Sequence, residues 1–233
     1  MGNIVFADLE NIDLRTTSLK VVESTDHLTD ETVLLSSSDT YPEAELNKGH
    51  NVFVPSDLLD NGSAAAGVYV FFDLEIYPFF QKVKENIQKQ DKPKGVFRFR
   101  RIVGKDETTS LAVGDLFIIA SLLGEPEAVK VKHTNHTVTP YHMIVTVNFG
   151  EGTMAHMEYT FGNDAERIEL EWSGIKNIIE FNSQEMAPID PSSNTNLPLA
   201  YSVDSILNTA RNADSVLIKR LNKYCQLING GAD

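Results

Sequence analysis

LAVGDLFIIASLLGEP, residues 111–126, is the stretch that decides the fold. Its first thirteen residues carry no polar stripe, with polar side chains only at Asp115 and Ser121. A helix that is apolar on all sides is typical of a protein interior. Gly124 followed by Pro126 is the usual way for such a helix to end. We therefore expect a buried helix over Leu111–Leu123, packed on one face of a sheet.

The sequence that follows this helix alternates apolar and polar residues. The alternation is clearest over residues 144–149, 156–161 and 166–172. A period of two predicts strands with one buried face, as in an antiparallel sheet. Gly150-Glu151-Gly152 is a short hairpin connection between two of them. The same alternation upstream predicts a further strand over Val96–Val103.

The first part of the chain has a different pattern, in which short apolar runs are separated by polar segments. Continuous apolar runs suit strands that are covered on both faces, as in a parallel sheet. The intervening segments Pro42–Lys48 and Ser56–Ala66 are predicted to be helices, which gives an α/β unit. The expected strands are Ile4–Phe6, Leu19–Val22, Val33–Leu35, Val52–Val54 and Val68–Phe72.

Composition excludes two classes of partner. The 233 residues carry a formal charge of −13, which disfavours nucleic acids and anionic membranes because both require clustered cations. The one dense basic run, Arg98, Arg100 and Arg101, alternates with Phe97 and Phe99 and indicates the solvent face of a strand. The sequence contains no apolar stretch of about 18 residues, which is the length that a membrane helix requires. With no visible signal peptide, we expect a cytoplasmic protein.

Several segments, taken in order, resemble the glucose-fructose oxidoreductase / inositol dehydrogenase (Gfo/Idh/MocA) family. Residues 114–126 are similar to the family's apolar helix that ends in Leu-Leu-Gly-Glu-Pro, and residues 147–155 to its strand–hairpin–strand. Residues 170–178 resemble a family turn, residues 69–90 the entry to the second domain, and residues 49–58 the "G-K-H-V-L-V-E-K-P-L" segment. The resemblance covers about residues 32 to 181.

This resemblance implies a fold of two domains. We expect a reduced Rossmann-like α/β layer over residues 1–75. An α+β domain over residues 76–233 would follow, with a mostly antiparallel open sheet backed by helices. Ser202 is predicted to cap a single closing helix over residues 202–228. The stretch before Gly49 is about half as long as the resemblance implies, which indicates the deletion of at least one strand–helix unit.

The resemblance also implies a dehydrogenase that uses NAD or NADP, but the nucleotide turn is altered. Such a turn needs glycines, so that backbone N–H groups can approach the pyrophosphate. Here the strand Ile4–Ala7 is followed by Asp8-Leu9-Glu10-Asn11-Ile12-Asp13, which contains no glycine. Acidic side chains at this place repel a phosphate. No cofactor is therefore expected.

The positions that carry catalysis in the family are altered as well. By the resemblance, the family's lysine falls on Ser56, its aspartate on Ser110 and its histidine on Gly114. None of these residues supplies the acid or base that hydride transfer requires. The arginine of the family's "R-F/Y-x-P" motif falls on Glu75, which reverses the charge. Asp57 and Asp115 are the adjacent acids that a substitute chemistry would have to use.

These observations favour a non-catalytic binding, regulatory or subunit-type protein. The alternative is an active NAD(P)-dependent sugar or cyclitol dehydrogenase with an atypical site. The resemblance implies a small sugar-like ligand and a homo-oligomer formed through the open face of the sheet. His142, Thr146 and Glu158 are the residues expected on that face.

A third hypothesis is an enzyme with different chemistry that uses a group of histidines. His133, His136, His142 and His156 all belong to the sheet region, and imidazoles from adjacent strands can bind a metal ion. On this hypothesis, His142 and His156 face each other across a hairpin. Histidines on a solvent-facing surface are the favoured interpretation, and no metal site is expected.

Overall fold

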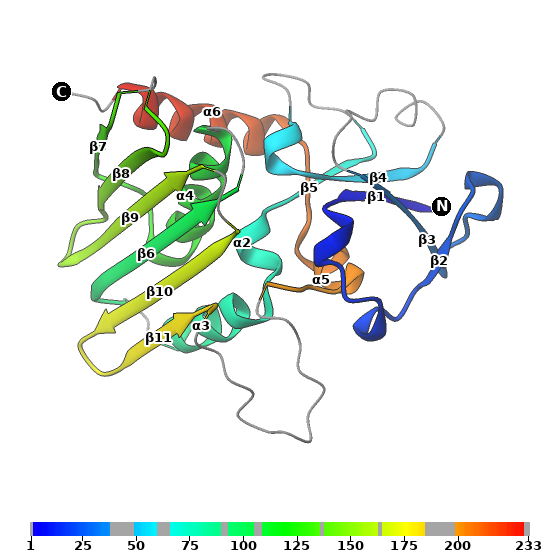
Figure 1. The fold of residues 1–233 in the computed structure, drawn as a ribbon, viewed down its shortest axis with the longest axis horizontal. Helices are drawn as coiled ribbons and strands as arrows, with labels where there is room; N and C mark the ends of the chain where they lie inside the picture. The colour runs from blue at the N-terminus through cyan, green and yellow to red at the C-terminus, as the bar shows by residue number, and fades with distance from the viewer. Residues whose placement is uncertain are drawn as a thin grey trace. The chain divides into compact units, whose positions relative to one another are not determined.

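The computed structural model of the chain is drawn in Figure 1. It describes residues 2–37, 49–59, 66–89, 93–104, 109–135, 138–162, 165–184 and 199–230. The chain forms two compact units, Met1–Gln81 with Leu199–Asn222, and Lys82–Pro198 with Lys223–Asp233. This division differs from the predicted one mainly in residues 199–222, which belong with the first unit.

The first unit is built on a sheet with the strand order β12-β5-β4-β1-β3-β2. The five strands from residues 1–75 are all parallel, and β12 pairs antiparallel with β5. The predicted parallel layer is thus confirmed, although β12 brings the sheet to six strands. The strands are β1 (Asn3–Ala7), β2 (Lys20–Val22), β3 (Thr32–Ser37), β4 (Asn51–Pro55), β5 (Val68–Phe71) and β12 (Arg211–Asn212).

The central strands explain why the apolar runs are continuous. Every residue from Ile4 to Ala7 in β1 is buried, and so is every residue from Val52 to Pro55 in β4. Both faces of these strands are therefore covered, as expected in a parallel sheet. In contrast, β2 lies at the edge of the sheet, and its three residues are exposed or half-buried.

Short turns of 3-10 helix connect the strands of this unit, and one of them lies where a helix was predicted. The predicted helix over Ser56–Ala66 is wrong in its described part, because residues 56–58 form a 3-10 turn, no side chain caps it and Leu59 is extended. The predicted helix over Pro42–Lys48 lies outside the described residues. The 3-10 turns are η1 (Leu9–Asn11), η2 (Leu14–Thr16), η3 (Thr25–His27) and η4 (Ser56–Leu58).

The second unit contains a sheet with the strand order β11-β10-β6-β9-β8-β7. Its neighbouring strands are antiparallel except β6 and β9, so the prediction of a mostly antiparallel sheet is confirmed. The strands are β6 (Gly95–Val103), β7 (Ala128–His133), β8 (Tyr141–Asn148), β9 (Thr153–Phe161), β10 (Arg167–Gly174) and β11 (Ile178–Asn182).

Helix α4 (Thr109–Leu123) covers one face of this sheet (Figure 1), and residues 223–230 of α6 (Ser215–Gly230) belong to the same unit. Almost all of α4 is buried, and Ile118 is only 1% exposed. The buried helix predicted over Leu111–Leu123 is therefore confirmed. Phe117 of α4 contacts the Tyr224 ring of α6, with ring centroids 6.3 Å apart. The opposite face of the sheet carries the polar residues of the alternating pattern.

The predicted closing helix over residues 202–228 is two helices. Ser202 caps α5 (Val203–Thr209) as expected, accepting a hydrogen bond from Ser205 N at 3.1 Å. A second cap follows at Asp214, whose carboxylate accepts from Val216 N and Leu217 N at 2.9 and 2.8 Å. Asp214 accepts hydrogen bonds from the first backbone amides of α6, so α6 begins after it as a separate helix. The residues between the two helices are extended and form β12.

Two further helices complete the described elements. Helix α2 (Asp73–Ile76) follows β5, and α3 (Pro78–Gln88) follows α2. Phe80, Val83 and Ile87 on the apolar face of α3 are all buried. Within the described residues, no helix combines the length and apolarity that crossing a membrane requires.

Candidate functional site

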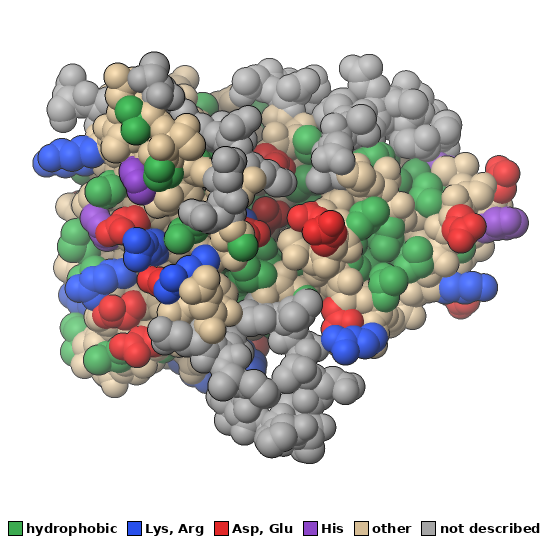
Figure 2. Space-filling model, viewed as in Figure 1, with side chains coloured by type: hydrophobic (Ala, Val, Ile, Leu, Met, Phe, Trp, Pro, Cys, Tyr) green, Lys and Arg blue, Asp and Glu red, His purple; other side chains and the backbone are tan. Residues whose placement is uncertain are grey.

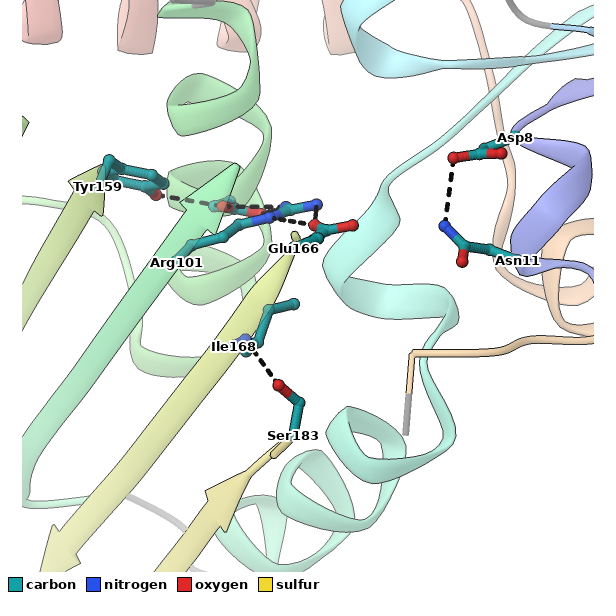
Figure 3. A network of polar contacts seen from close by, with 8 residues as sticks. Asp8, Asn11, Arg101, Tyr159, Glu166, Ile168 and Ser183 are labelled. Carbon is teal, nitrogen blue, oxygen red and sulfur yellow. Dashed lines mark hydrogen bonds and ion pairs between the residues drawn. The ribbon is translucent and has the colours of Figure 1, made fainter. Parts of the chain in front are cut away.

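The turn after β1 is closed by its own carboxylate (Figure 3). Asp8 precedes η1, and its Oδ1 accepts a hydrogen bond from Glu10 N at 3.1 Å. Its Oδ2 accepts from Asn11 Nδ2 at 3.2 Å. Asp13 caps the next turn in the same way, accepting from Arg15 N at 3.0 Å. The amides that open these turns are therefore already paired with negative groups.

The C-terminal segment of the same unit holds this turn from the other side. Asp13 N donates to the carbonyl oxygen of Tyr201 at 2.8 Å, and Tyr201 N donates to the carbonyl oxygen of Asn11 at 3.0 Å. The Tyr201 hydroxyl donates to the carbonyl oxygen of Asp8 at 3.3 Å. No sequence pattern indicates this contact, because Asn11 and Tyr201 are distant along the chain.

These residues do not fit the pyrophosphate of a dinucleotide. Phosphate binding at such a place uses free backbone N–H groups and the N-terminus of an α-helix. Here the element is a 3-10 turn of three residues, Leu9–Asn11. The backbone amide of Glu10 in this turn already donates to the Asp8 carboxylate. A pyrophosphate would have to displace that carboxylate and remain close to its charge, which is repulsive.

The three positions that carry catalysis in the resembling family lie in different units. Ser56 begins η4 directly after β4 in the first unit. Ser110 and Gly114 lie one turn apart on α4 in the second unit, and Gly114 is buried. None of the three side chains is a general base at neutral pH.

Next to Gly114, a buried polar cluster joins α4 to the sheet (Figure 3). Arg101 of β6 donates from its NH1 group to the Asp115 oxygens at 3.3 and 3.4 Å. It also donates from Nε and NH2 to Glu166 Oε1 at 2.8 and 2.5 Å. The Tyr159 hydroxyl of β9 donates to Asp115 Oδ2 at 3.2 Å. The cluster therefore places a carboxylate, a guanidinium and a phenol together inside the second unit.

Burial dominates the electrostatics of this cluster. Loss of hydration raises the pKa of Asp115 to about 6, although the charge of Arg101 and the hydrogen bond from Tyr159 act in the opposite direction. Burial and the Asp115 charge also raise the pKa of Tyr159 well above its usual value. Asp115 is thus a carboxyl group with a pKa close to the physiological range, but it is 2% exposed and already paired.

Arg101 corrects the interpretation of the basic run. Arg98 and Arg100 are exposed as predicted, whereas Arg101 is 2% exposed. Strict alternation places residue 101 on the same face as Phe97 and Phe99, which point to the core. Arg101 can be buried there because Asp115 and Glu166 compensate its charge.

A second buried ion pair lies in the first unit. Glu75 of α2 is 1% exposed, and Arg211 of β12 donates to both of its carboxylate oxygens at 2.5 and 2.9 Å. The Arg211 guanidinium also lies 5.4 Å from the centre of the Phe72 ring. The buried Glu75 carboxylate is thus paired with an arginine from a distant part of the chain.

The open face of the second sheet carries the residues predicted for an oligomer interface. His142 is exposed, and Thr146 and Glu158 are half-buried on this face. Figure 2 shows charged side chains of both signs gathered over this part of the molecule. Their use in an oligomer stays a prediction.

The histidines of this sheet do not converge as the metal-site hypothesis would require. His142 stands opposite Thr160, and His156 stands opposite Thr146, so the two histidines do not face each other. His136 lies outside the described residues, and His133 lies on the edge strand β7. In the described part of the chain, no group of three or more His, Cys, Asp or Glu side chains is arranged to hold a metal ion.

Comparison with known proteins relates the fold to dehydrogenases. No protein-family model and no curated protein matches the sequence. Among solved structures, the chain is similar to a myo-inositol dehydrogenase from Lactobacillus casei, in complex with NAD(H) and myo-inositol. The identity is 13%, the TM-score is 0.55, and 85% of this chain and 74% of that chain are covered.

Two further structures give the same result. A myo-inositol dehydrogenase from Corynebacterium glutamicum is 9% identical with a TM-score of 0.53, covering 88% of this chain and 80% of that chain. A probable dehydrogenase from Thermotoga maritima is 16% identical with a TM-score of 0.51, covering 86% and 70%. Identities this low establish the fold alone.

Proposed function

We propose that this chain, which has the fold of the Gfo/Idh/MocA-type dehydrogenases, is a cytoplasmic protein that neither binds a nicotinamide dinucleotide nor transfers a hydride. It acts instead as a binding, regulatory or subunit-type protein. The observation that carries the proposal is the hydrogen bond from Glu10 N to the Asp8 carboxylate. The negative Asp8 carboxylate takes the hydrogen bond that a pyrophosphate would need at this turn.

The catalytic positions support the same conclusion. Removing hydride from a carbinol requires a base that takes the hydroxyl proton, and a well-placed base contributes about 10²–10⁴-fold. Ser56 and Ser110 carry neutral hydroxyl groups, and Gly114 has no side chain. A dehydrogenase with these residues would lack both its cofactor site and its proton acceptor.

One observation favours the alternative, an active dehydrogenase with an atypical site. A pKa of about 6 at Asp115 is the kind of shift found in catalytic acids and bases. Against this, the carboxylate is buried and is held by Arg101 and Tyr159. We therefore assign Asp115 a structural role and treat the alternative as an outcome of the test.

The test is calorimetry of the purified protein with NAD, NADH, NADP and NADPH, together with turnover assays on myo-inositol and glucose. We expect no saturable heat of binding and no turnover. A dinucleotide-dependent dehydrogenase of the same fold serves as the positive control. Saturable binding of any of the four dinucleotides would overturn the proposal. Oxidation that Asp115→Asn abolishes would show that the chemistry had moved to Asp115.

A further inference from the structure

Strand β11 forms one edge of the second sheet (Figure 1), and in the described part of the chain β10 is the only strand that pairs with it. Just beyond β11, Ser183 N donates to the carbonyl oxygen of Ile168 at 3.0 Å, in the register of the two strands. Hydrogen-bonded residues alternate along an antiparallel pair, so residues 179 and 181 also direct their backbone groups to β10. The backbone groups that point away from β10 belong to Ile178, Glu180 and Asn182.

These outward N–H and C=O groups lie in the plane of the sheet and belong to neither of its faces. Among the described residues, they make no backbone hydrogen bond, and no cation pairs with the exposed Glu180 side chain. The Ile178 side chain is 68% exposed, and that of Ile175 in the preceding turn is 77% exposed. The edge therefore offers free donors and acceptors next to exposed apolar side chains.

The opposite edge of the same sheet is protected. Strand β7 carries Lys130 and Lys132, and both are exposed. Lysines on an edge strand discourage the pairing of another chain with it. In contrast, residues 178–182 read Ile-Ile-Glu-Phe-Asn and contain neither lysine nor proline. The two edges thus differ in the feature that decides whether a further strand can be added.

We propose that β11 binds an extended segment of a partner protein, which adds to the sheet as a further strand and in which basic and apolar residues alternate. Main-chain hydrogen bonds to the outward groups of β11 supply the affinity, and alternate side chains supply the specificity. This partner class goes beyond the proposed function and does not depend on it, because β11 shares no residue with the turn after β1 or with the catalytic positions.

The two faces of β11 indicate the side chains of this segment. Ile179 and Phe181 are half-buried on the side of the sheet that carries the core, so the residues of an added strand on that side should be apolar. Glu180 lies on the other side, beside Glu171, which already pairs with Arg98. A lysine or arginine opposite Glu180 would give this carboxylate the cation that it lacks.

Charge disfavours the other occupants of this edge. A second copy of the chain, paired antiparallel over all three outward residues, would place Glu180 opposite Glu180. Like charges directly opposite each other destabilise a strand pair, and an acidic segment would meet the same repulsion. The formal charge of −13 also favours the approach of a basic partner over an acidic one.

The test uses a short synthetic peptide of alternating valine and lysine, added to isotope-labelled protein and followed by NMR. We expect saturable shifts at the amides of β11. Glu180→Pro should weaken binding by about ten-fold or more, because it removes the central outward donor and leaves the hydrogen bonds to β10 in place. Glu180→Gln keeps the backbone and should weaken binding by up to about five-fold through the loss of charge. The matched control is Glu127→Gln, at an exposed acid before β7, which should bind like the parent protein.

Several results would overturn the proposal. These are an absence of saturable shifts, equal affinity for a peptide of alternating valine and glutamate, shifts confined to β7, and parent-like binding in Glu180→Pro. If circular dichroism shows that Glu180→Pro is unfolded, Ile178→Lys takes its place, because a lysine protects an edge in the same way. Self-association that these variants abolish, without any effect of the peptide, would assign the edge to a second copy. Failure of the proposed function would be seen separately, as dinucleotide binding that Glu180→Pro leaves unchanged.

Discussion

Arg211 holds Glu75 through two hydrogen bonds between residues that are 136 positions apart, with N–O distances of 2.5 and 2.9 Å. The Glu75 side chain is 2% exposed, whereas that of Arg211 is 31% exposed. A carboxylate at this depth depends on its partner, since an unpaired buried charge is strongly destabilising. The pair also joins α2 to the antiparallel strand β12 within the first unit.

Replacing Arg211 tests this dependence. We expect Arg211→Met to lower the free energy of unfolding by about 3 kcal/mol or more, because Glu75 is left buried without its main cation. Urea unfolding measures the loss. Lys20→Met, an exposed cation in the same unit, is the control and should change little. The double variant Glu75→Gln, Arg211→Met should recover part of the loss, and no recovery would contradict the explanation.

Asp115 predicts a specific dependence of stability on pH. Its pKa is raised by burial from 3.8 to about 6, so the folded protein binds this proton more tightly than the unfolded chain. Its contribution to the free energy of unfolding therefore falls as pH rises from about 4 to 6, by up to about 3 kcal/mol. In Asp115→Asn this contribution is absent. Unfolding curves of both proteins at several pH values should diverge over that interval, and parallel curves would refute the assignment.

Helix α4 should not tolerate a charge at its centre. Ile118 is 1% exposed, and an unpaired buried carboxylate costs several kcal/mol against a total stability of about 5–15 kcal/mol. We expect Ile118→Asp to be unfolded by circular dichroism. The matched change Val216→Asp, at a side chain that is 72% exposed, should leave the protein folded. A cooperative thermal transition in Ile118→Asp would be the contrary result.

The hairpin between β8 and β9 constrains the residue at its tip. Glu151 has a φ of 52°, between Gly150 at 75° and Gly152 at 83°. A β-branched residue strongly disfavours this left-handed region, and asparagine tolerates it. Glu151→Val should therefore lower the free energy of unfolding by about 1–2 kcal/mol relative to Glu151→Asn. Both variants lose the same exposed contact with Lys94, so the difference isolates the backbone. Equal stability would contradict the backbone argument.

The elements with a strong period were predictable from sequence, and so was the order of the layers. Helix α4 was identified by its unbroken apolar run, and the second sheet by alternation along β8, β9 and β10. The hairpin Gly150–Gly152 followed from its glycines. These features depend on neighbouring residues, which a single sequence displays directly.

Features that depend on distant partners were missed. Arg101 is buried because Asp115 and Glu166 meet it, although its odd position in the alternation with Phe97 and Phe99 was a usable signal. The pairing of His142 with Thr160 follows from the hairpin turn, which sets the register of β8 and β9, so counting outward from Glu151 was the usable signal.

The break in the C-terminal helix was missed for a different reason. Residues 203–228 keep an apolar stripe that continues across Asp214, so periodicity alone predicts one helix. Asp214 was the local signal, because aspartate is a favoured cap at the start of a helix.

The return of residues 199–222 to the first sheet has a consequence for the order of events on the ribosome. Domains usually fold as soon as they emerge, beginning at the N-terminus. Here the edge strand β12, the cation for Glu75 and the Tyr201 contacts with the turn after β1 all come from residues 201–212. Residues 3–76 must therefore wait until these later residues have been synthesised before their unit is complete, which leaves the edge of β5 unpaired in the meantime.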